Sequence, residues 1–240
     1  MKNVIMAWGC INVLEANADF MRIAGVDEAG RGCVIGPLVI AGVVMDEDKL
    51  SDLVRAGVRD SKLLSAGRRE VIAREIMRIA ERCAVVKLLP AEIDWVVDNK
   101  RRLYSLNRLE AQAMAKVIEK LEPDMAFVDA ADVVEERFAR YIREGLVFKT
   151  RIVAEHKADR NYLVVSAASI IAKVERDKEV ALLRSVFGDF GSGYLSDPRT
   201  VRFLREWVQL HEEYPDCVRK SWKPAKRIKA EQSTAQKRFS

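Results

Sequence analysis

Residues 22–32 read RIAGVDEAGRG: four apolar or small residues after Arg22, then the acids Asp27 and Glu28, then an arginine between two glycines. The small and β-branched residues favour a buried strand over 22–26. A second run, PLVIAGVVM at 37–45, is almost continuously apolar, which is typical of a strand buried on both faces. The two runs predict the interior of a sheet whose rim carries acidic side chains.

Apolar runs and helical periodicity alternate along the rest of the chain. Strands are expected over 83–89, 125–129 and 148–155, and helices over 65–82, from 90, and over 105–121, 133–144, 162–187 and 199–211. Ser65 is a favoured N-cap residue, and Pro90 suits a first helical turn. The alternation predicts an α/β fold with a mixed sheet and a smaller helical part after about residue 190.

The composition is that of an ordinary folded protein. Of 240 residues, 49% are hydrophobic and 32% charged, which excludes wholesale disorder. Four cysteines without a C-x-x-C pair and only two histidines exclude a zinc site and a disulfide framework, and indicate reduced thiols in the cytoplasm. No apolar run approaches the ~18 residues of a membrane-spanning helix, so no membrane partner is expected.

The two ends of the chain differ from its body. Residues 1–20 resemble a secretory signal in outline, but polar residues interrupt the apolar stretch, so we expect a leader or a short extension. Residues 218–240 contain eight basic residues and one acid, and this charge of +7 leaves −2 for residues 1–217. A basic tail either serves solubility alone or binds a polyanion such as nucleic acid.

Acidic residues stand where apolar segments end. Asp27 and Glu28 follow the first, Asp129 ends the run at 125–129, and Asp159 lies before the long helix. Each alone is typical of a cap or turn, but sites in open α/β sheets form at the carboxyl ends of strands. Carboxylates ~4 Å apart repel by roughly 4 kcal/mol per pair at an effective dielectric of ~20, so a cluster protonates or binds cations. Oxygen ligands alone favour Mg²⁺ or Mn²⁺ and metal-assisted phosphodiester cleavage.

The adjacency of Asp27 and Glu28 presents a geometric difficulty. Neighbouring side chains on a regular strand point to opposite faces of the sheet. Both reach one site only if the strand twists outward or ends at Glu28, which Ala29 and Gly30 permit.

Two glycine-rich segments are candidates for substrate contact. The GRG turn at 30–32 leaves backbone N–H groups open to a sugar or phosphate. A dinucleotide-binding G-x-G-x-x-G turn would need glycine where the chain has Ile35. Tyr194, which follows GSG at 191–193, can stack on a sugar or base, although a tyrosine packed onto the core is the commoner role.

Six segments together resemble the type 2 ribonuclease H family, and within it ribonuclease HII of the archaeal kind. They are DEAGRG (27–32), DSK (60–62), VDAAD (128–132), EHKAD (155–159), SAASIIAKVERD (166–177) and GSGYLSDP (191–198). Their order and spacing match the family over about residues 21–224, so the resemblance does not rest on any one segment.

The resemblance implies a fold and an activity. The fold is α/β and ribonuclease H-like, with a mixed five-stranded sheet flanked by helices and a C-terminal helical region. The activity is metal-dependent cleavage of the RNA strand of RNA–DNA hybrids, and cutting 5′ to single ribonucleotides embedded in duplex DNA. In-line attack of water at a site of two Mg²⁺ or Mn²⁺ ions leaves 5′-phosphate and 3′-hydroxyl ends.

The resemblance also implies roles for individual residues. The catalytic, metal-binding carboxylates are Asp27, Glu28, Asp129 and Asp159. Gly30, Arg31 and Gly32 match the segment that contacts the ribonucleotide's 2′-hydroxyl and the adjoining phosphate. Tyr194 matches a tyrosine that packs on the following deoxyribose, and Lys62 a lysine that contacts phosphate. We interpret His156 as structural and Asp132 as a cap of the next helix.

Four parts are expected in the chain: a leader or non-family extension (1–20), a ribonuclease H-like catalytic domain (21–190), a helical substrate-binding region (191–224) and a basic, disordered tail (225–240). Residues 232–239 partly resemble a peptide that binds a sliding clamp, although Ala235 and Arg238 stand where bulky apolar and aromatic residues belong. A monomer is expected.

Two other functions fit the same residues. One is a catalytically silent nucleic-acid-binding module, which would have no use for an acidic cluster facing phosphates. The other is a DNA-specific nuclease of the same superfold, which would not need the GRG turn or Tyr194.

Overall fold

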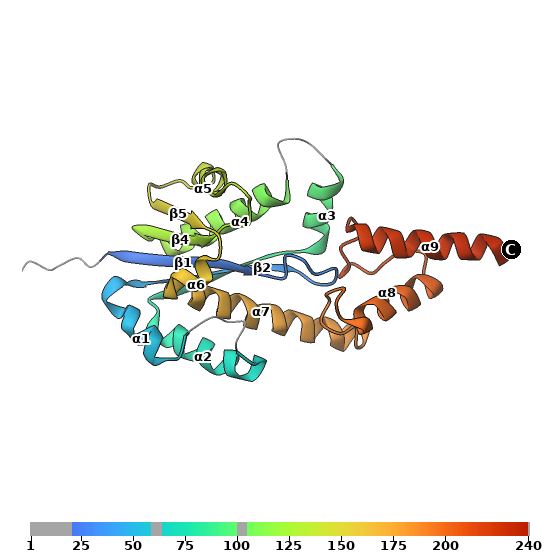
Figure 1. Ribbon diagram of the computed structural model, residues 1–240, viewed down its shortest axis with the longest axis horizontal. Coiled ribbons are helices and arrows are strands. Elements are labelled where there is room, and N and C mark those ends of the chain that lie inside the picture. The colour runs from blue at the N-terminus through green and yellow to red at the C-terminus, as the bar shows by residue number, and fades with distance from the viewer. Residues whose placement is uncertain (1–20, 59–63, 100–104, 240) are drawn as a thin grey trace, which may run out of the picture.

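A five-stranded sheet in the order β3-β2-β1-β4-β5 forms the centre of the computed structural model (Figure 1), which describes residues 21–58, 64–99 and 105–239, with side chains to 232. The strands are β1 (Arg22–Ala29), β2 (Leu38–Asp46), β3 (Arg82–Leu88), β4 (Met125–Asp129) and β5 (Arg151–Glu155). β1 pairs antiparallel with β2 and parallel with β4, while β3 joins β2 antiparallel and β5 joins β4 parallel. The predicted mixed five-stranded sheet is confirmed.

Helices cover both faces of this sheet. One face carries α1 (Leu50–Arg55), α2 (Ala66–Ile79) and α7 (Leu163–Phe187), and the other α3 (Pro90–Asp98), α4 (Leu106–Leu121) and α5 (Glu135–Glu144). The short η1 (Glu47–Lys49) and α6 (Ala158–Asn161) precede α1 and α7. Gly25 lies so close to α7 that a Cβ there would be 2.2 Å from the carbonyl carbon of Val164, so only glycine allows this packing.

Local sequence signals predict where several elements begin. The Ser65 hydroxyl accepts from the N–H of Arg68 as the N-cap of α2, and Pro90 stands in the first turn of α3. Two strands differ from expectation. β1 continues beyond residue 26 because β2 pairs with it through Ala29, and β5 begins only at Arg151, which lies opposite the first residue of β4.

The C-terminal part forms a further apolar cluster beside the sheet. α8 (Pro198–Leu210) and α9 (Lys223–Phe239) extend away from it (Figure 1) and pack with Val34 and Ile35. The predicted disorder of residues 225–240 is wrong for the backbone, which is helical to Phe239. The helix forms because Ala225 and Ile228 are buried in the cluster that α8 shares.

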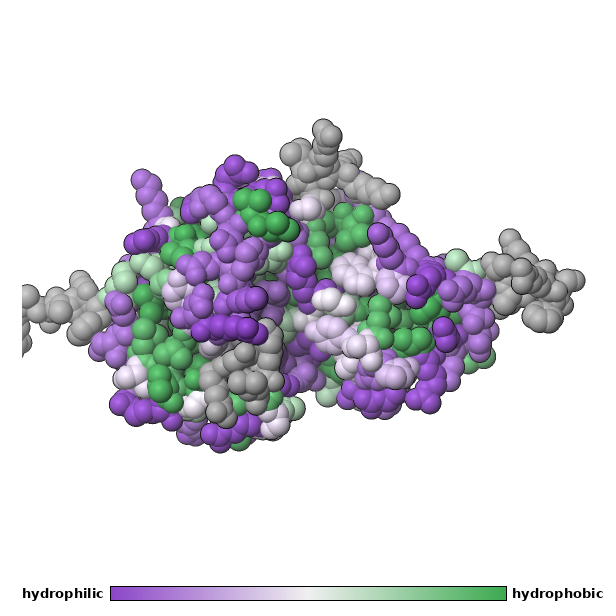
Figure 2. All heavy atoms as spheres, viewed as in Figure 1, coloured by the Kyte–Doolittle hydropathy of each residue, from purple (hydrophilic) through white to green (hydrophobic). Residues whose placement is uncertain are grey.

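The other general expectations concern thiols, membranes and surface. Cys33, Cys83 and Cys217 are free, and within the described ranges no helix is long and apolar enough to cross a bilayer. Hydrophilic and hydrophobic residues are interspersed on the face drawn in Figure 2. Residues 1–20, for which a leader or extension is predicted, lie outside the described residues.

Candidate active site

A cleft of about 410 Å³ opens where β1 and β4 end. Its lining comprises the acids Asp27, Glu28, Asp129, Asp159 and Asp177, the segment Ala29, Gly30, Arg31 and Gly32, the bases Arg69, Lys173 and Arg176, and Tyr194. The cleft therefore brings together every site residue predicted from the sequence except Lys62, which lies outside the described residues.

Asp27 and Glu28 border the cleft from opposite faces of β1. Asp27 interacts with Ser169 and Lys173 of α7, whereas Glu28 lies near Glu110 of α4. The alternation of side chains expected for a regular strand is thus present.

The sheet itself explains how both side chains reach one cleft. β1 pairs with β2 as far as Ala29, but its pairing with β4 stops at Val26, which lies opposite Val128. Beyond Val26 one edge of β1 has no neighbouring strand, so both faces border the same opening. Of the two conditions expected, an end of the strand at Glu28 is not met, because β1 continues to Ala29.

Burial dominates the electrostatics of these acids. It raises the pKa of Asp27 to about 6, against the opposing effect of Lys173. Burial, together with Asp27 and Glu110, raises the pKa of Glu28 well above its usual range. Glu28 Oε2 is buried without a hydrogen-bond partner in the part of the chain that the structure describes. Such a group holds a proton or accepts a cation.

Asp129 and Asp159 come from two neighbouring elements. Asp129 is the last residue of β4, and its Oδ1 accepts from the backbone N–H of Ala158 at 3.1 Å. This bond ties the end of β4 to α6, the short helix that carries the buried Asp159. Two acids thirty residues apart are thereby held at one end of the sheet.

The Gly30–Gly32 turn is fixed from two sides. Gly30 has a φ of +90°, and a Cβ there would lie 2.6 Å from Nε of Arg176, so glycine is required. The fully buried Arg219 donates to the carbonyls of Gly30 (2.7 Å) and Arg31 (2.8 Å). The Arg31 side chain is bound on α4 by Glu110 (2.9 Å) and Asn107 (2.7 Å).

Tyr194 lines the cleft rather than the core. The Arg176 guanidinium lies 4.7 Å from its ring centroid and donates to the carbonyl of Ser192 at 2.9 Å. Burial raises the pKa of the Tyr194 phenol. The ring is therefore held on the cleft wall by a cation that is itself bound to the GSG loop.

The expectation that Asp132 caps the next helix is wrong, because the N-cap residue of α5 is Val134, and among the described residues no side chain caps it. Asp132 accepts from the N–H of Val134, just before α5, and pairs with Arg137, whose hydrogen bonds lower the pKa of Asp132 to about 2. His156 follows β5, and its Nδ1 lies 3.2 Å from the carbonyl of Ala130, which belongs to the loop between β4 and α5 that also carries Asp132. Neither residue lines the cleft.

Sequence reasoning missed several residues that shape the cleft: Arg69, Asn107, Glu110, Lys173, Arg176 and Arg219. A signal existed for Glu110, which stands four residues before Met114 and seven before Val117, on the apolar stripe of its helix. No local pattern marks Arg219, which lies in an irregular segment between α8 and α9.

The chemistry of the cleft suits divalent cations. Carboxylate oxygens are the ligands of Mg²⁺ and Mn²⁺, and the buried Glu28 Oε2 has no hydrogen-bond partner among the described residues. Within the described part of the chain, no three His, Cys, Asp or Glu side chains form a closed metal-binding group in the arrangement seen. The acids therefore have the ligand type and the location of a divalent-metal site. Their side chains would have to rotate to bring three or more oxygens onto one ion.

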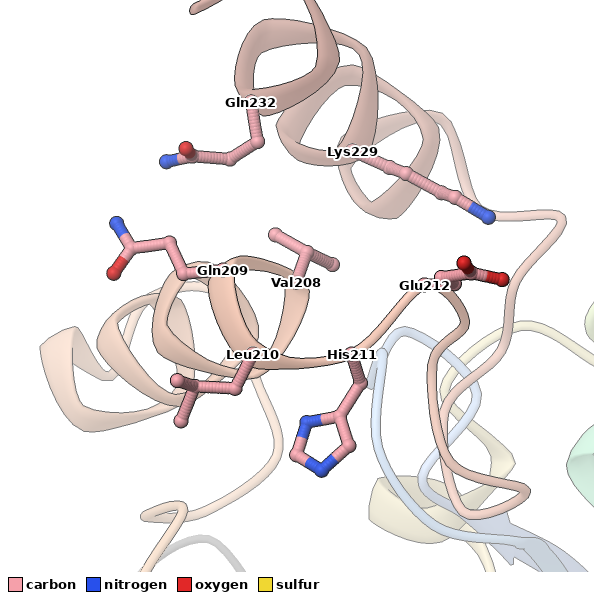
Figure 3. Close-up of a pocket in the computed structure, with 7 residues that line it drawn as sticks. All are labelled: Val208, Gln209, Leu210, His211, Glu212, Lys229 and Gln232. Carbon is pink, nitrogen blue, oxygen red and sulfur yellow. The ribbon is translucent and has the colours of Figure 1, made fainter. Parts of the chain in front are cut away.

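A second hollow of about 300 Å³ lies between α8 and α9 (Figure 3). It is lined by Val208, Gln209, Leu210, His211, Glu212, Lys229 and Gln232. With one acid and no residue from the sheet, it offers no comparable cluster of charges.

Comparisons with known proteins agree with one another. The family model for ribonuclease HII matches residues 24–225. Ribonuclease HII of Pyrococcus abyssi is 46% identical over 218 residues, which cover 90% of this chain and 95% of that protein. The crystal structure of ribonuclease H2 from Pyrococcus horikoshii OT3 has a TM-score of 0.80 at 45% identity, covering 88% and 98% of the two chains. Ribonuclease HII of Archaeoglobus fulgidus, solved in a complex with PCNA, has a TM-score of 0.76 at 48% identity, covering 86% and 96%.

Proposed function

The chain belongs to the ribonuclease HII family of metal-dependent ribonucleases H, and on this premise we propose that it both cleaves the RNA strand of RNA–DNA hybrids and cuts 5′ to single ribonucleotides in duplex DNA. The products carry 5′-phosphate and 3′-hydroxyl ends. The observation that carries the proposal is the meeting of four carboxylates, the Gly30–Gly32 turn and Tyr194 in one cleft. A catalytically silent binding module would not need the four carboxylates. A DNA-specific nuclease would not need the Gly30–Gly32 turn or Tyr194.

The residues proposed to hold the divalent ions are Asp27, Glu28, Asp129 and Asp159. Two bound Mg²⁺ or Mn²⁺ ions would supply an acidified water and stabilise charge on the leaving oxygen. Without such cations, Asp27 and Glu28 repel each other in a buried setting, which is part of the reason that the pKa of Glu28 is raised. Lys173 lies beside Asp27 and offsets part of that charge.

Recognition of RNA rests on the turn and the tyrosine. The 2′-hydroxyl is the group that distinguishes RNA from DNA at a given site, and rejecting a substrate without it requires polar groups that would otherwise stay unpaired. The N–H groups of the Gly30–Gly32 turn supply such donors. The Tyr194 ring packs on the next deoxyribose, with residues 191–224 as the substrate-binding region. Contact of Lys62 with phosphate stays a prediction, as do the monomeric state and the cytoplasmic location.

An end-labelled DNA duplex with one ribonucleotide tests the proposal. In Mg²⁺ we expect a single cut 5′ to the ribonucleotide, leaving a 3′-hydroxyl, and no cut in EDTA or in the matched all-DNA duplex. An intact duplex beside a cleaved continuous hybrid would contradict the roles of the turn and Tyr194. Cleavage of the all-DNA duplex would contradict the selectivity for RNA.

We also propose that the end of α9 binds a sliding clamp, as the partial match of residues 232–239 to a clamp-binding peptide suggests. The A. fulgidus relative has been solved in a complex with PCNA. A chain ending at Glu231 should lose PCNA binding in surface plasmon resonance yet retain cleavage of free duplex. Equal PCNA affinity of the two chains would refute this role.

A further inference from the structure

Glu110 is a buried acid that the proposed chemistry does not use. Its side chain is 0% exposed in the middle of α4, among the apolar residues of one core cluster. Its Oε2 accepts from Nε of Arg31, while its Oε1 is buried without a hydrogen-bond partner within the described ranges. A buried carboxylate with one unpaired oxygen lowers the stability of the fold. This cost suggests that Glu110 serves to position another group.

What Glu110 holds is the side chain of the arginine in the GRG turn. Asn107, one helical turn earlier, accepts from Nη2 of Arg31 at 2.7 Å. The pair uses two of the five N–H donors of Arg31 and leaves the Nη1 group for other partners. The Arg31 side chain is 38% exposed and lines the cleft, so those remaining donors are accessible to a ligand.

The backbone of Arg31 is bound separately. Its carbonyl accepts from Arg219 Nη1, and the carbonyl of Gly30 accepts from Arg219 Nη2. The backbone of the turn is therefore set by Arg219, whereas the direction of the guanidinium is set by α4. Loss of Glu110 would release Nε of Arg31 and leave the guanidinium held at Nη2 by Asn107, without removing these backbone contacts.

We infer that Glu110 is a positioning residue that orients the Arg31 guanidinium toward the phosphate next to the recognised ribonucleotide. The inference rests on the proposed function, because it takes the Gly30–Gly32 turn as the place where substrate binds. Orientation before binding spares the cost of ordering a flexible arginine at the moment of contact. The expected consequence of losing Glu110 is weaker substrate binding, with the chemical step retained.

A double-mutant cycle on the single-ribonucleotide duplex tests this role. The variants are Glu110→Ala, Glu110→Gln, Arg31→Ala and the double change to Ala, and the control is Glu119→Ala on the same helix. We expect Glu110→Ala to raise KM by about thirtyfold, as for a lost charged hydrogen bond, with kcat within about threefold. Glu110→Gln, which keeps an acceptor for Nε, should raise KM less than about fivefold. In the Arg31→Ala background, Glu110→Ala should change KM by less than about twofold.

The contrary results are separable from a failure of the proposed function. Independent effects of the two changes on KM, or a fall in kcat at unchanged KM, would overturn the inference and place Glu110 with the carboxylates. If the wild type cuts only the continuous hybrid, the proposed single-ribonucleotide activity fails, and the same cycle measured on the hybrid still decides the coupling. Should Glu110→Ala not fold, a KM for Glu110→Gln equal to that of Arg31→Ala would equally refute positioning by a hydrogen bond.

Discussion

Asp27→Asn is expected to lower the cleavage rate by about 10³-fold while making the metal-free protein more stable above pH 6. The rate falls because one proposed ligand of the divalent ions loses its charge, and several kcal/mol of transition-state stabilisation go with it. Stability rises because Asp27 is 4% exposed, and its burial raises its pKa from 3.8 to about 6.

The sign of the pH effect follows from that shift. Between pH 4 and pH 6 the unfolded chain releases the Asp27 proton first, so the free energy of unfolding of the wild type falls as pH rises through this window. Above pH 6 the loss is complete, on the order of 2–3 kcal/mol at about 1.4 kcal/mol per pK unit. Asparagine does not ionise, so the Asp27→Asn variant does not lose this stability. Its midpoint of thermal unfolding at pH 8 should therefore lie about 5 °C above that of the wild type.

Calorimetry in EDTA from pH 4 to pH 8, beside cleavage assays in Mg²⁺, measures both effects. Asp132→Asn is the matched control, because Asp132 is about as inaccessible to solvent but has Arg137, outside the cleft, as its main partner, with a further contact to Asn107. Its pKa is lowered to about 2, so its contribution to stability is present at neutral pH and lost on acidification. This variant should be less stable at pH 7 and retain cleavage. A destabilised Asp27→Asn at pH 8, or an inactive Asp132→Asn, would contradict the assignment.

Arg219→Leu is expected to cost about 3–5 kcal/mol of folding free energy and to abolish cutting at a single ribonucleotide. The Arg219 guanidinium is fully buried and donates to the carbonyls of Gly30, Arg31 and Gly36 at 2.7–3.2 Å. Leucine fills similar space, but the carbonyl of Arg31 loses its Arg219 donor, and those of Gly30 and Gly36 keep only their weaker contacts with Cys33. Each buried carbonyl that loses a partner costs about 1–3 kcal/mol. The turn that faces the substrate would also lose its backbone support.

Urea unfolding and the single-ribonucleotide assay measure this prediction. Lys220→Leu is the neighbouring control, because the Lys220 side chain is 41% exposed and pairs with the exposed Asp216. It should change the unfolding free energy by less than about 0.5 kcal/mol. Arg219→Lys should fall between wild type and Arg219→Leu, since one ammonium cannot span three carbonyls. An Arg219→Leu variant as stable as the wild type would show that these carbonyls find other partners.

Much of the fold was predictable because its signals are short-range. The apolar run of β2 and the serine that caps α2 are read from neighbouring residues, and the structure agrees with both. The disorder expected at the C-terminal end failed for the opposite reason. α9 is helical because Ala225 and Ile228 meet α8, and that contact is not visible in a basic segment taken alone.

The candidate site divides in the same way. The sequence by itself placed Asp27, Glu28 and Asp129 at strand ends, because apolar runs stop there, and the resemblance supplied their proposed roles. Only the tertiary structure decided that Asp27 and Glu28 border one cleft, since this depends on β1 continuing for three residues beyond its last pair with β4. Glu110 and Arg219 were identified around the GRG turn from the tertiary structure alone, because each of them contacts Arg31, which lies 79 and 188 residues away along the chain.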